Sequence, residues 1–413
     1  MKKSQVLFQQ HIGRMFRAHW KLQGQKVLID SGALKELKLK GIPYEDANEV
    51  VREHKIETKF QIDNSEHFPP KPTQLDENHP DYHEEPCLKY SDNNVLLGGL
   101  DQAKVFTNSC EMHLDTLPVL ENMKLSHDSP YDNLVEKCIK SSLIYDATQE
   151  KLPKIKDPER PAFNFARVYG ITDKRKNFLL GKRLIQLCSS LSPQLLDHRT
   201  LVPGPIYFQA GLQRNEKRIL LSNVADILVT SSKKIKPIID SKVTQDMPLP
   251  NIYPLSPHVS LEAHNFYQFK DIFPINENFE KSNVHTVVVH FNKTEVVNLY
   301  DIEVSESQFL ARSLMKCYTF ALAQARHNYG EDVIDLPEPI VVQCVQMDSK
   351  IFHFSILQLN TTAGPEETSI HNAYWNLPSI SLYDICDYID GKPEIQGYNP
   401  LVFQTLFGFF QNS

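Results

Sequence analysis

The sequence predicts an α+β fold, in which helices are mixed with mainly antiparallel strands. Strand-length apolar runs are paired around short polar turns, as in hairpins, and helical patterns lie between these pairs. Glycine is scarce (15 residues) and proline is common (26 residues), which disfavours folds built on glycine-rich phosphate loops. No apolar run reaches the roughly 18 residues of a membrane-spanning helix. A chain of 413 residues exceeds the length of one typical domain, so a large core or two packed units is expected.

Residues 1–29 predict a mitochondrial targeting presequence. The segment contains six basic residues and no acidic residue, whereas the rest of the chain has 38 bases against 51 acids, a net charge of −13. Its apolar residues recur at helical intervals, at Phe8, Ile12, Met15, Phe16 and Trp20. A basic, acid-free amphipathic helix is typical of matrix-targeting segments. The alternative is a basic surface helix of the mature protein.

Residues 30–105 are predicted to form an N-terminal segment that carries an extended arm, followed by an α+β globular core over 106–413. Residues 31–59 have the pattern of a short helix with charged faces. Segment 60–92 contains five prolines, eight acids and two lysines. Because proline fixes φ and lacks a donor, we expect this Pro/acid-rich arm to have no regular secondary structure.

Two helices are expected in the first half of the core. Ser129-Pro130 is a typical helix start, with Leu134, Cys138 and Ile139 as the predicted buried stripe. The second helix is predicted by four leucines at spacings of four, three and four, which are Leu180, Leu184, Leu187 and Leu191.

Strands are predicted in the middle of the chain. The runs 206–210 and 218–222 lie on either side of a polar turn. The runs 284–291 and 296–300 flank Asn292-Lys293, which predicts a second hairpin.

The C-terminal third has the clearest pattern. Ser305 and Gln308 form a capping box, and apolar residues then repeat at helical spacing until Gly330. Strands are predicted at 339–346 and 350–361, joined by a three-residue turn. We expect this helix and these two strands to form the buried centre of the fold.

The sequence contains no common catalytic or nucleotide-binding motif. The seven cysteines include no CxxC pair, which predicts reduced, mostly buried thiols in a reducing compartment. His79 and His83 are spaced like zinc ligands, but Pro80 between them disfavours the helix that this spacing requires, so a solvated acidic loop is favoured. His353 and Cys344 are interpreted as structural residues. They remain the candidates for an alternative function, a matrix enzyme or ligand-binding protein.

Residues 151–183 form a local basic zone, with ten Lys and Arg against three acids. Aromatic residues are interleaved among these charges, which suits phosphate contact together with base stacking. The other interpretation is a solvated charged face. A smaller basic cluster spans Ser231–Lys236.

Several short blocks, read together, resemble the mitochondrial large-subunit ribosomal protein thirty-seven family. They are Ala321–Arg326, Tyr329–Asp332, Pro339–Val345, Phe352–Phe354, Gln358–Thr362, Tyr253–Pro257, Leu184–Cys188 and His79–Tyr82. The resemblance is close over roughly 250–375 and weak over 190–250 and the last 35 residues. It implies a mitochondrial location in the matrix and a structural, non-enzymatic role without cofactor in the large mitoribosomal subunit.

The resemblance also implies partners. These are the large-subunit rRNA and neighbouring mitoribosomal proteins, among them the related protein sixty-five, formerly numbered thirty in the small subunit. The acidic net charge predicts a peripheral position with RNA contact through a local patch. We expect that patch to consist of Lys174, Arg175, Lys176, Lys182 and Arg183. In a competing account, these charges pair with the acidic arm at 60–92.

Overall fold

The computed structural model describes residues 17, 19–21, 32–45, 77–116, 131–154, 159–160, 165–166, 168–276, 278–298 and 302–412. The chain divides into two compact units, residues 1–73 and residues 74–413. In the first unit, helix α2 (Ala33–Leu39) has no buried residue. Most of the predicted presequence, and residues 60–76 of the predicted arm, lie outside the described residues.

The second unit is built on one mixed sheet in which antiparallel pairs predominate, which confirms the predicted α+β class. Its strands are ordered β2-β11-β10-β9-β8-β6-β1-β7, with β5 beside β6 and β12 beside β10. They span β1 (Tyr82–Ser91), β2 (Ser109–Glu111), β5 (Arg199–Arg214), β6 (Lys217–Ser231), β7 (Glu262–Phe266), β8 (Asn283–His290), β9 (Asp335–Met347), β10 (Ile351–Thr361), β11 (Asn372–Asn376) and β12 (Ile380–Ser381). Two small ladders pair β3 (Glu150–Lys151) with β4 (Tyr169–Gly170), and β13 (Ile385–Ile389) with β14 (Lys392–Gln396).

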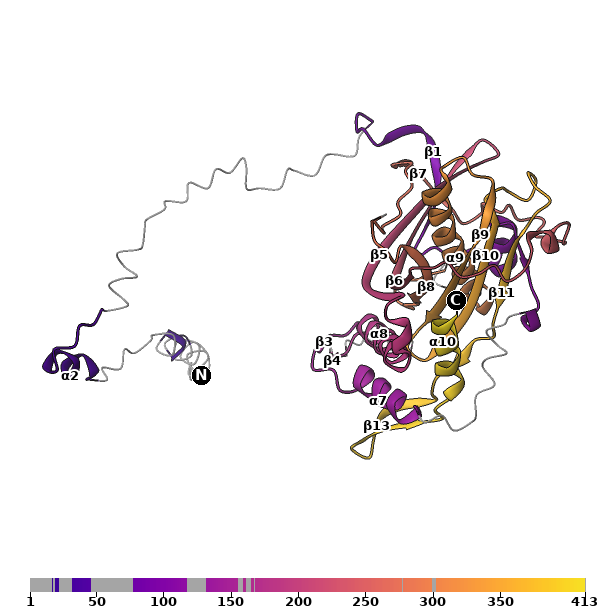
Figure 1. Ribbon diagram of the computed structural model, residues 1–413. Coiled ribbons are helices and arrows are strands. Elements are labelled where there is room, and N and C mark those ends of the chain that lie inside the picture. Colours follow the sequence, from indigo (N-terminus) through magenta and orange to yellow (C-terminus); the bar gives the residue numbers. More distant parts are fainter. Residues whose placement is uncertain are drawn as a thin grey trace, which may run out of the picture. The chain divides into compact units, whose positions relative to one another are not determined.

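Helices pack on both faces of this sheet (Figure 1). They are α5 (Gly99–Phe106), α7 (Asp132–Leu143), α8 (Asp173–Leu191), α9 (Glu306–Tyr329) and α10 (Pro400–Gln411). Alternate residues of β9 face opposite sides, so Val342 and Cys344 join the core around α9, whereas Val341 and Val345 join the core under α8 and α10. Among the helices that the structure describes, none is long and apolar enough to cross a membrane.

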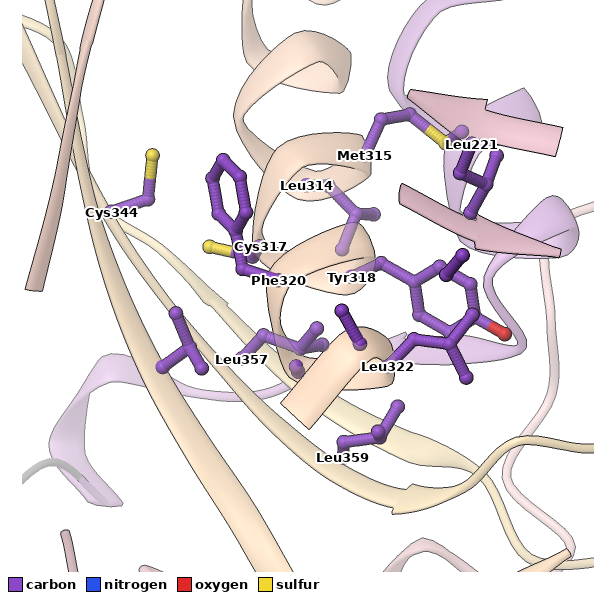
Figure 2. Close-up of a cluster of buried hydrophobic side chains, with 14 of the residues drawn as sticks. Leu221, Leu314, Met315, Cys317, Tyr318, Phe320, Leu322, Cys344, Leu357 and Leu359 are labelled. Carbon is purple, nitrogen blue, oxygen red and sulfur yellow. The ribbon is translucent and has the colours of Figure 1, made fainter. Parts of the chain in front are cut away.

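Helix α9 is the buried centre of the fold, as the sequence predicts. Its capping box is present, with the Gln308 amide N–H donating to the Ser305 hydroxyl, and Gly330 ends the helix at a φ of 95°. Leu314 and Phe320 are fully buried. Figure 2 shows side chains of α9 among those of β6, β9 and β10. The predicted strands 339–346 and 350–361 are confirmed as parts of β9 and β10.

Strands β5 and β6 form a longer hairpin than the sequence predicts. The predicted runs 206–210 and 218–222 lie inside them, and the two strands pair from Arg199 with Ser231 to Arg214 with Lys217. The connecting residues Asn215 and Glu216 both have positive φ, as a tight two-residue hairpin turn requires.

Two predictions about local elements are wrong. Strand β8 forms as expected, but residues 296–298 are not a strand, because β6 and β9 already occupy both edges of β8. The buried stripe of α7 also differs from the prediction. Val135 and Ile139 are buried, whereas Leu134 is 41% exposed.

The prediction of an irregular arm is wrong for residues 82–91, which form β1 between β6 and β7. Pro86 lies where the register of β1 with β7 shifts, between Tyr82 and Cys87, so its missing donor interrupts no regular ladder. Helix α5 packs against α9 in the same core. The described residues 77–105, which precede the predicted core at 106–413, therefore belong to the same compact unit as that core.

Candidate nucleic-acid interface

Helix α8 carries all five residues predicted to contact rRNA. Its leucine stripe is confirmed, because Leu180 and Leu184 are fully buried against the sheet and Leu187 packs at the edge of the same core. Among the five basic residues, Lys174 is exposed and the other four are half-buried. The helix therefore brings the five residues onto one element but gives them different surroundings.

The two arginines bind groups within the chain. Arg175 pairs with Asp146, and its second contact, from Nη2 to Oδ1, is 2.9 Å long. This hydrogen-bonded partner holds the pKa of the Asp146 carboxyl below its usual range. Arg183 donates from Nη1 to the hydroxyls of Ser141 and Ser142, at 2.8 and 3.0 Å. Both arginines thus connect α8 to α7 and the residues that follow it.

The three lysines are held less firmly. The Lys176 ammonium lies 3.5 Å from the Asp173 carboxylate, and that of Lys182 lies 5.9 Å from the centre of the Phe178 ring. Lys174 makes no ion pair with any residue that the structure describes. The lysines are therefore better placed than the arginines to bind an external anion.

Beside α8 the sheet contains a gap. Strand β1 pairs parallel to β6 up to Ser91, and β8 pairs antiparallel to β6 along its later part. Strand β5 covers one edge of β6 along its whole length, so β1 and β8 share the other edge. Since β1 is parallel and β8 is antiparallel to β6, these two strands run towards each other. Their carboxyl ends leave β6 residues 223–226 without a strand partner on that edge.

Charged side chains satisfy the backbone groups in this sheet gap. The Asp92 carboxylate accepts from the Val224 amide N–H at 2.9 Å, and the Lys316 ammonium donates to the Val224 carbonyl at 2.9 Å. Lys316 and Arg312 both contact Asp92, and both are buried. Burial and the Arg312 charge lower the pKa of Lys316 to about 8, against the opposing effect of Asp92. Although burial alone would raise the pKa of Asp92, the two cations hold it below its usual value.

A second pair closes the other side of the sheet gap. The Asp226 carboxylate accepts from the His290 amide N–H at 2.8 Å and lies 3.3 Å from His290 Nδ1. Burial would raise the pKa of Asp226, but His290 lowers it to about 2. His290 Nε2 is buried and has no hydrogen-bond partner among the described residues. Both residues line a cavity of about 590 Å³ that also reaches Lys174 at the start of α8.

Sequence reasoning missed this cluster, and one signal pointed to it. Asp226 interrupts the apolar strand pattern of residues 219–229, and a buried acid requires a partner. Its partners lie on other elements, at positions that no spacing in the sequence connects.

The alternative catalytic candidates are enclosed in the core. His353 lies between Ser313 Oγ, 2.8 Å from Nδ1, and Asn376 Oδ1, 2.7 Å from Nε2. This resembles a nucleophile–base–orienter set, but Ser313 and His353 are fully buried, and burial lowers the pKa of His353 to about 4. Cys344 is fully buried in the core around α9. The structural interpretation of His353 and Cys344 fits these surroundings.

The predicted zinc-like pair is not assembled into a metal site. His83 stacks on the Tyr267 ring with centroids 4.2 Å apart, and His79 Nδ1 accepts from the Asp81 amide N–H at 3.1 Å. Within the described ranges, no group of three His, Cys, Asp or Glu side chains could hold a metal ion.

Comparisons with known proteins point to one class. Residues 275–413 match the family described as "Mitochondrial 28S ribosomal protein S30 (PDCD9)", so the match includes the last 35 residues, where the sequence blocks were weak. The large ribosomal subunit protein mL37 of Mus musculus is 29% identical over 73% of this chain and 67% of its own length. The mL37 protein of Bos taurus is 27% identical over 79% of this chain and 74% of its own length. The chain is therefore similar, over most of its length, to curated homologues named large ribosomal subunit protein mL37, as the ordered sequence blocks predict.

Proposed function

We propose that this protein is a structural constituent of the large subunit of the mitochondrial ribosome and supports mitochondrial translation. The homology to mL37 proteins over most of the chain carries this proposal. The acidic net charge after residue 29 favours a peripheral position, because a protein that penetrates rRNA needs an excess of basic residues. Its partners are rRNA and neighbouring ribosomal proteins.

The alternative, a matrix enzyme or ligand-binding protein, predicts different sedimentation. We expect the protein to co-migrate with large ribosomal subunits when a mitochondrial lysate is separated on a sucrose gradient. The buried positions of His353 and Cys344 argue against their use on a substrate. A soluble pool that holds nearly all of the protein would contradict the ribosomal function.

The proposed protein partner is the related mitoribosomal protein sixty-five. Residues 275–413 match a family described by another mitoribosomal protein, so this part of the fold is shared with a relative. Chemical cross-linking of intact large subunits should join the two chains.

We further propose that residues 1–29 are removed on import, because the segment is basic, acid-free and amphipathic. Mass spectrometry of the protein purified from mitochondria should find a new N-terminus before Asp30. An intact Met1 on that material would contradict the proposal.

The rRNA contact is proposed for the basic side of α8, and it predicts weaker attachment when the charges are removed. Exchanging Lys174, Arg175, Lys176, Lys182 and Arg183 for glutamine should release the protein from isolated large subunits at lower salt, because each lost phosphate contact removes a counterion-release contribution. Release is measured by washing the subunits across a salt gradient.

The internal partners of the arginines supply a matched control. The triple variant with glutamine at Lys174, Lys176 and Lys182 should reproduce most of the five-residue effect and leave the melting temperature unchanged. The variant with glutamine at Arg175 and Arg183 should instead lower the melting temperature, since it breaks contacts between α8 and α7. Retention of the five-residue variant like the wild type at every salt concentration would disprove the RNA contact. Protease sensitivity of residues 60–92 in that variant would support the competing pairing with the arm.

A further inference from the structure

We propose that the cavity at the sheet gap binds a single unpaired nucleotide of an RNA strand, with its phosphate at the start of α8 and its base against Tyr207. This inference rests on the proposed function and names the chemistry of one RNA contact. The cavity has a volume of about 590 Å³, which is within the usual range of small-molecule sites and large enough for one nucleotide. Its walls come from the end of β1, the end of β8, the middle of β5 and the first turn of α8.

The start of α8 offers donors to a phosphate. Thr172 is the N-cap residue, but its side chain makes no capping hydrogen bond, so the first amide N–H groups of this 19-residue helix lack that partner. The helix dipole adds a partial positive charge at the same end. Lys174 also lines the cavity and makes no ion pair with the part of the chain that the structure describes. Asp173, the acid of the same turn, pairs with Lys176 and not with Lys174.

His290 offers a ring nitrogen to a base. Its Nδ1 lies 3.3 Å from the Asp226 carboxylate, and Nε2 has no partner among the described residues, although the side chain is only 2% exposed. A ligand group that forms a hydrogen bond with Nε2 would satisfy it.

The aromatic wall favours a flat ligand. Tyr207 projects from β5 with 61% of its surface exposed, and Phe178 of α8 lines the same cavity. Stacking on such rings is the usual way in which proteins hold unpaired bases.

The carboxylates in the cavity favour a nucleotide over a bare phosphate or a polyphosphate. Asp92 is paired with Lys316 and Arg312, and Asp226 is paired with His290, but Glu150 and Glu295 add two acceptors beside Lys174. They suit the exocyclic amino group of a base or a ribose hydroxyl. An arginine of a partner protein would also suit these acceptors, but it would leave Lys174 and the helix N-terminus without an anion.

A neighbouring cavity favours a polymer. It has a volume of about 460 Å³ and shares Glu150, Thr172, Lys174, Asn292 and Glu295 with the first. The two cavities therefore adjoin along the first turn of α8, which gives the nucleotides next to the bound one a path over the surface.

The test measures binding of the purified full chain to fluorescently labelled RNA pentamers by anisotropy. The two pentamers are five cytidines (C5) and five uridines (U5). We expect Tyr207→Ala and Lys174→Gln each to weaken binding of C5. The loss for Tyr207→Ala should be roughly tenfold, as expected when one stacked base loses its ring partner. Tyr253→Ala and Lys236→Gln, which change exposed residues elsewhere, should have no effect. Binding of C5 should also be tighter than that of U5, because cytosine presents an amino donor where uracil presents a carbonyl.

Several results would overturn the inference. One is wild-type affinity of Tyr207→Ala for C5, and another is equal or weaker binding of C5 than of U5. Cytidine monophosphate binding as tightly as C5 would assign the cavity to a free nucleotide, and displacement of C5 by N-acetylarginine amide would assign it to a protein side chain. If any of these occurs while the wild-type protein still sediments with large subunits, the cavity proposal fails and the ribosomal function stands. If the wild-type protein does not sediment with them, the proposed function itself fails.

Discussion

Leu314→Asp is expected to lower the free energy of unfolding by about 3 kcal/mol or more, because it places an unpaired carboxylate in the core. Leu314 is fully buried, and Figure 2 shows it pointing from α9 into the main cluster of apolar side chains. Chemical denaturation followed by circular dichroism measures the change. An unchanged denaturation midpoint would disprove the orientation of α9.

Leu134→Asp is the matched control for this prediction. Leu134 was predicted from the sequence to lie in a buried stripe, but it is 41% exposed on α7. We expect this substitution to change the free energy of unfolding by less than about 1 kcal/mol, as is usual for surface positions. A loss as large as that of Leu314→Asp would mean that α7 is rotated from the position described.

Asp92→Ala is expected to destabilise the protein by about 3 kcal/mol, the lower end of the range for breaking a buried ion pair. The substitution leaves the ammonium of Lys316 and the guanidinium of Arg312 without their shared carboxylate, and it also leaves the Val224 amide N–H unpaired. The lower end applies because the Asp92 side chain is 30% exposed and water can partly replace it. Thermal unfolding monitored by calorimetry measures the loss.

A second substitution separates the charge effect from packing. Lys316→Met on the Asp92→Ala background should recover part of the stability, because it removes the cation that the first change leaves unpaired. Asp101→Ala, at an exposed position, should have little effect. If Asp92→Ala is as stable as the wild type, the sheet gap does not depend on this ion pair.

The parts of the fold predicted correctly are those with local signals. The capping box and apolar repeat of α9 lie within one segment, and strands β9 and β10 follow directly and pair with each other. The leucine stripe of α8 is equally local. In each case residues that are neighbours in the sequence are also neighbours in the structure, so the spacing of apolar residues was sufficient to predict the element.

Strand β1 was not predicted, because the proline-rich composition of residues 60–92 indicated irregular structure although part of this segment pairs within the sheet. Five prolines between residues 60 and 92 predicted an irregular arm, but Pro86 lies at a register shift and Pro80 precedes the strand. The partners of β1 are β6 and β7, far along the chain, so no local pattern indicated that this segment enters the sheet.

The basic residues of α8 could be named from the sequence, but their surroundings could not. The charge excess of residues 151–183 singled out the basic residues of α8, whereas the internal partners of Arg175 and Arg183 depend on how α7 packs. The cavity was not predicted, because Asp92, Asp226, His290 and Arg312 meet only where two strands end.

The position of β1 affects the order in which the chain folds. Synthesis proceeds from the N-terminus, so residues 82–91 emerge long before β6 and β7, the two strands that flank them. Until residues 217–231 are available, both edges of β1 are unpaired and could associate with other chains. Pairing over so long a loop is slow, because the entropy of closing the loop is lost before the contacts form. Insertion of β1 is therefore expected to be a late step in folding, and one at which a chaperone that shields extended segments would raise the yield of native protein.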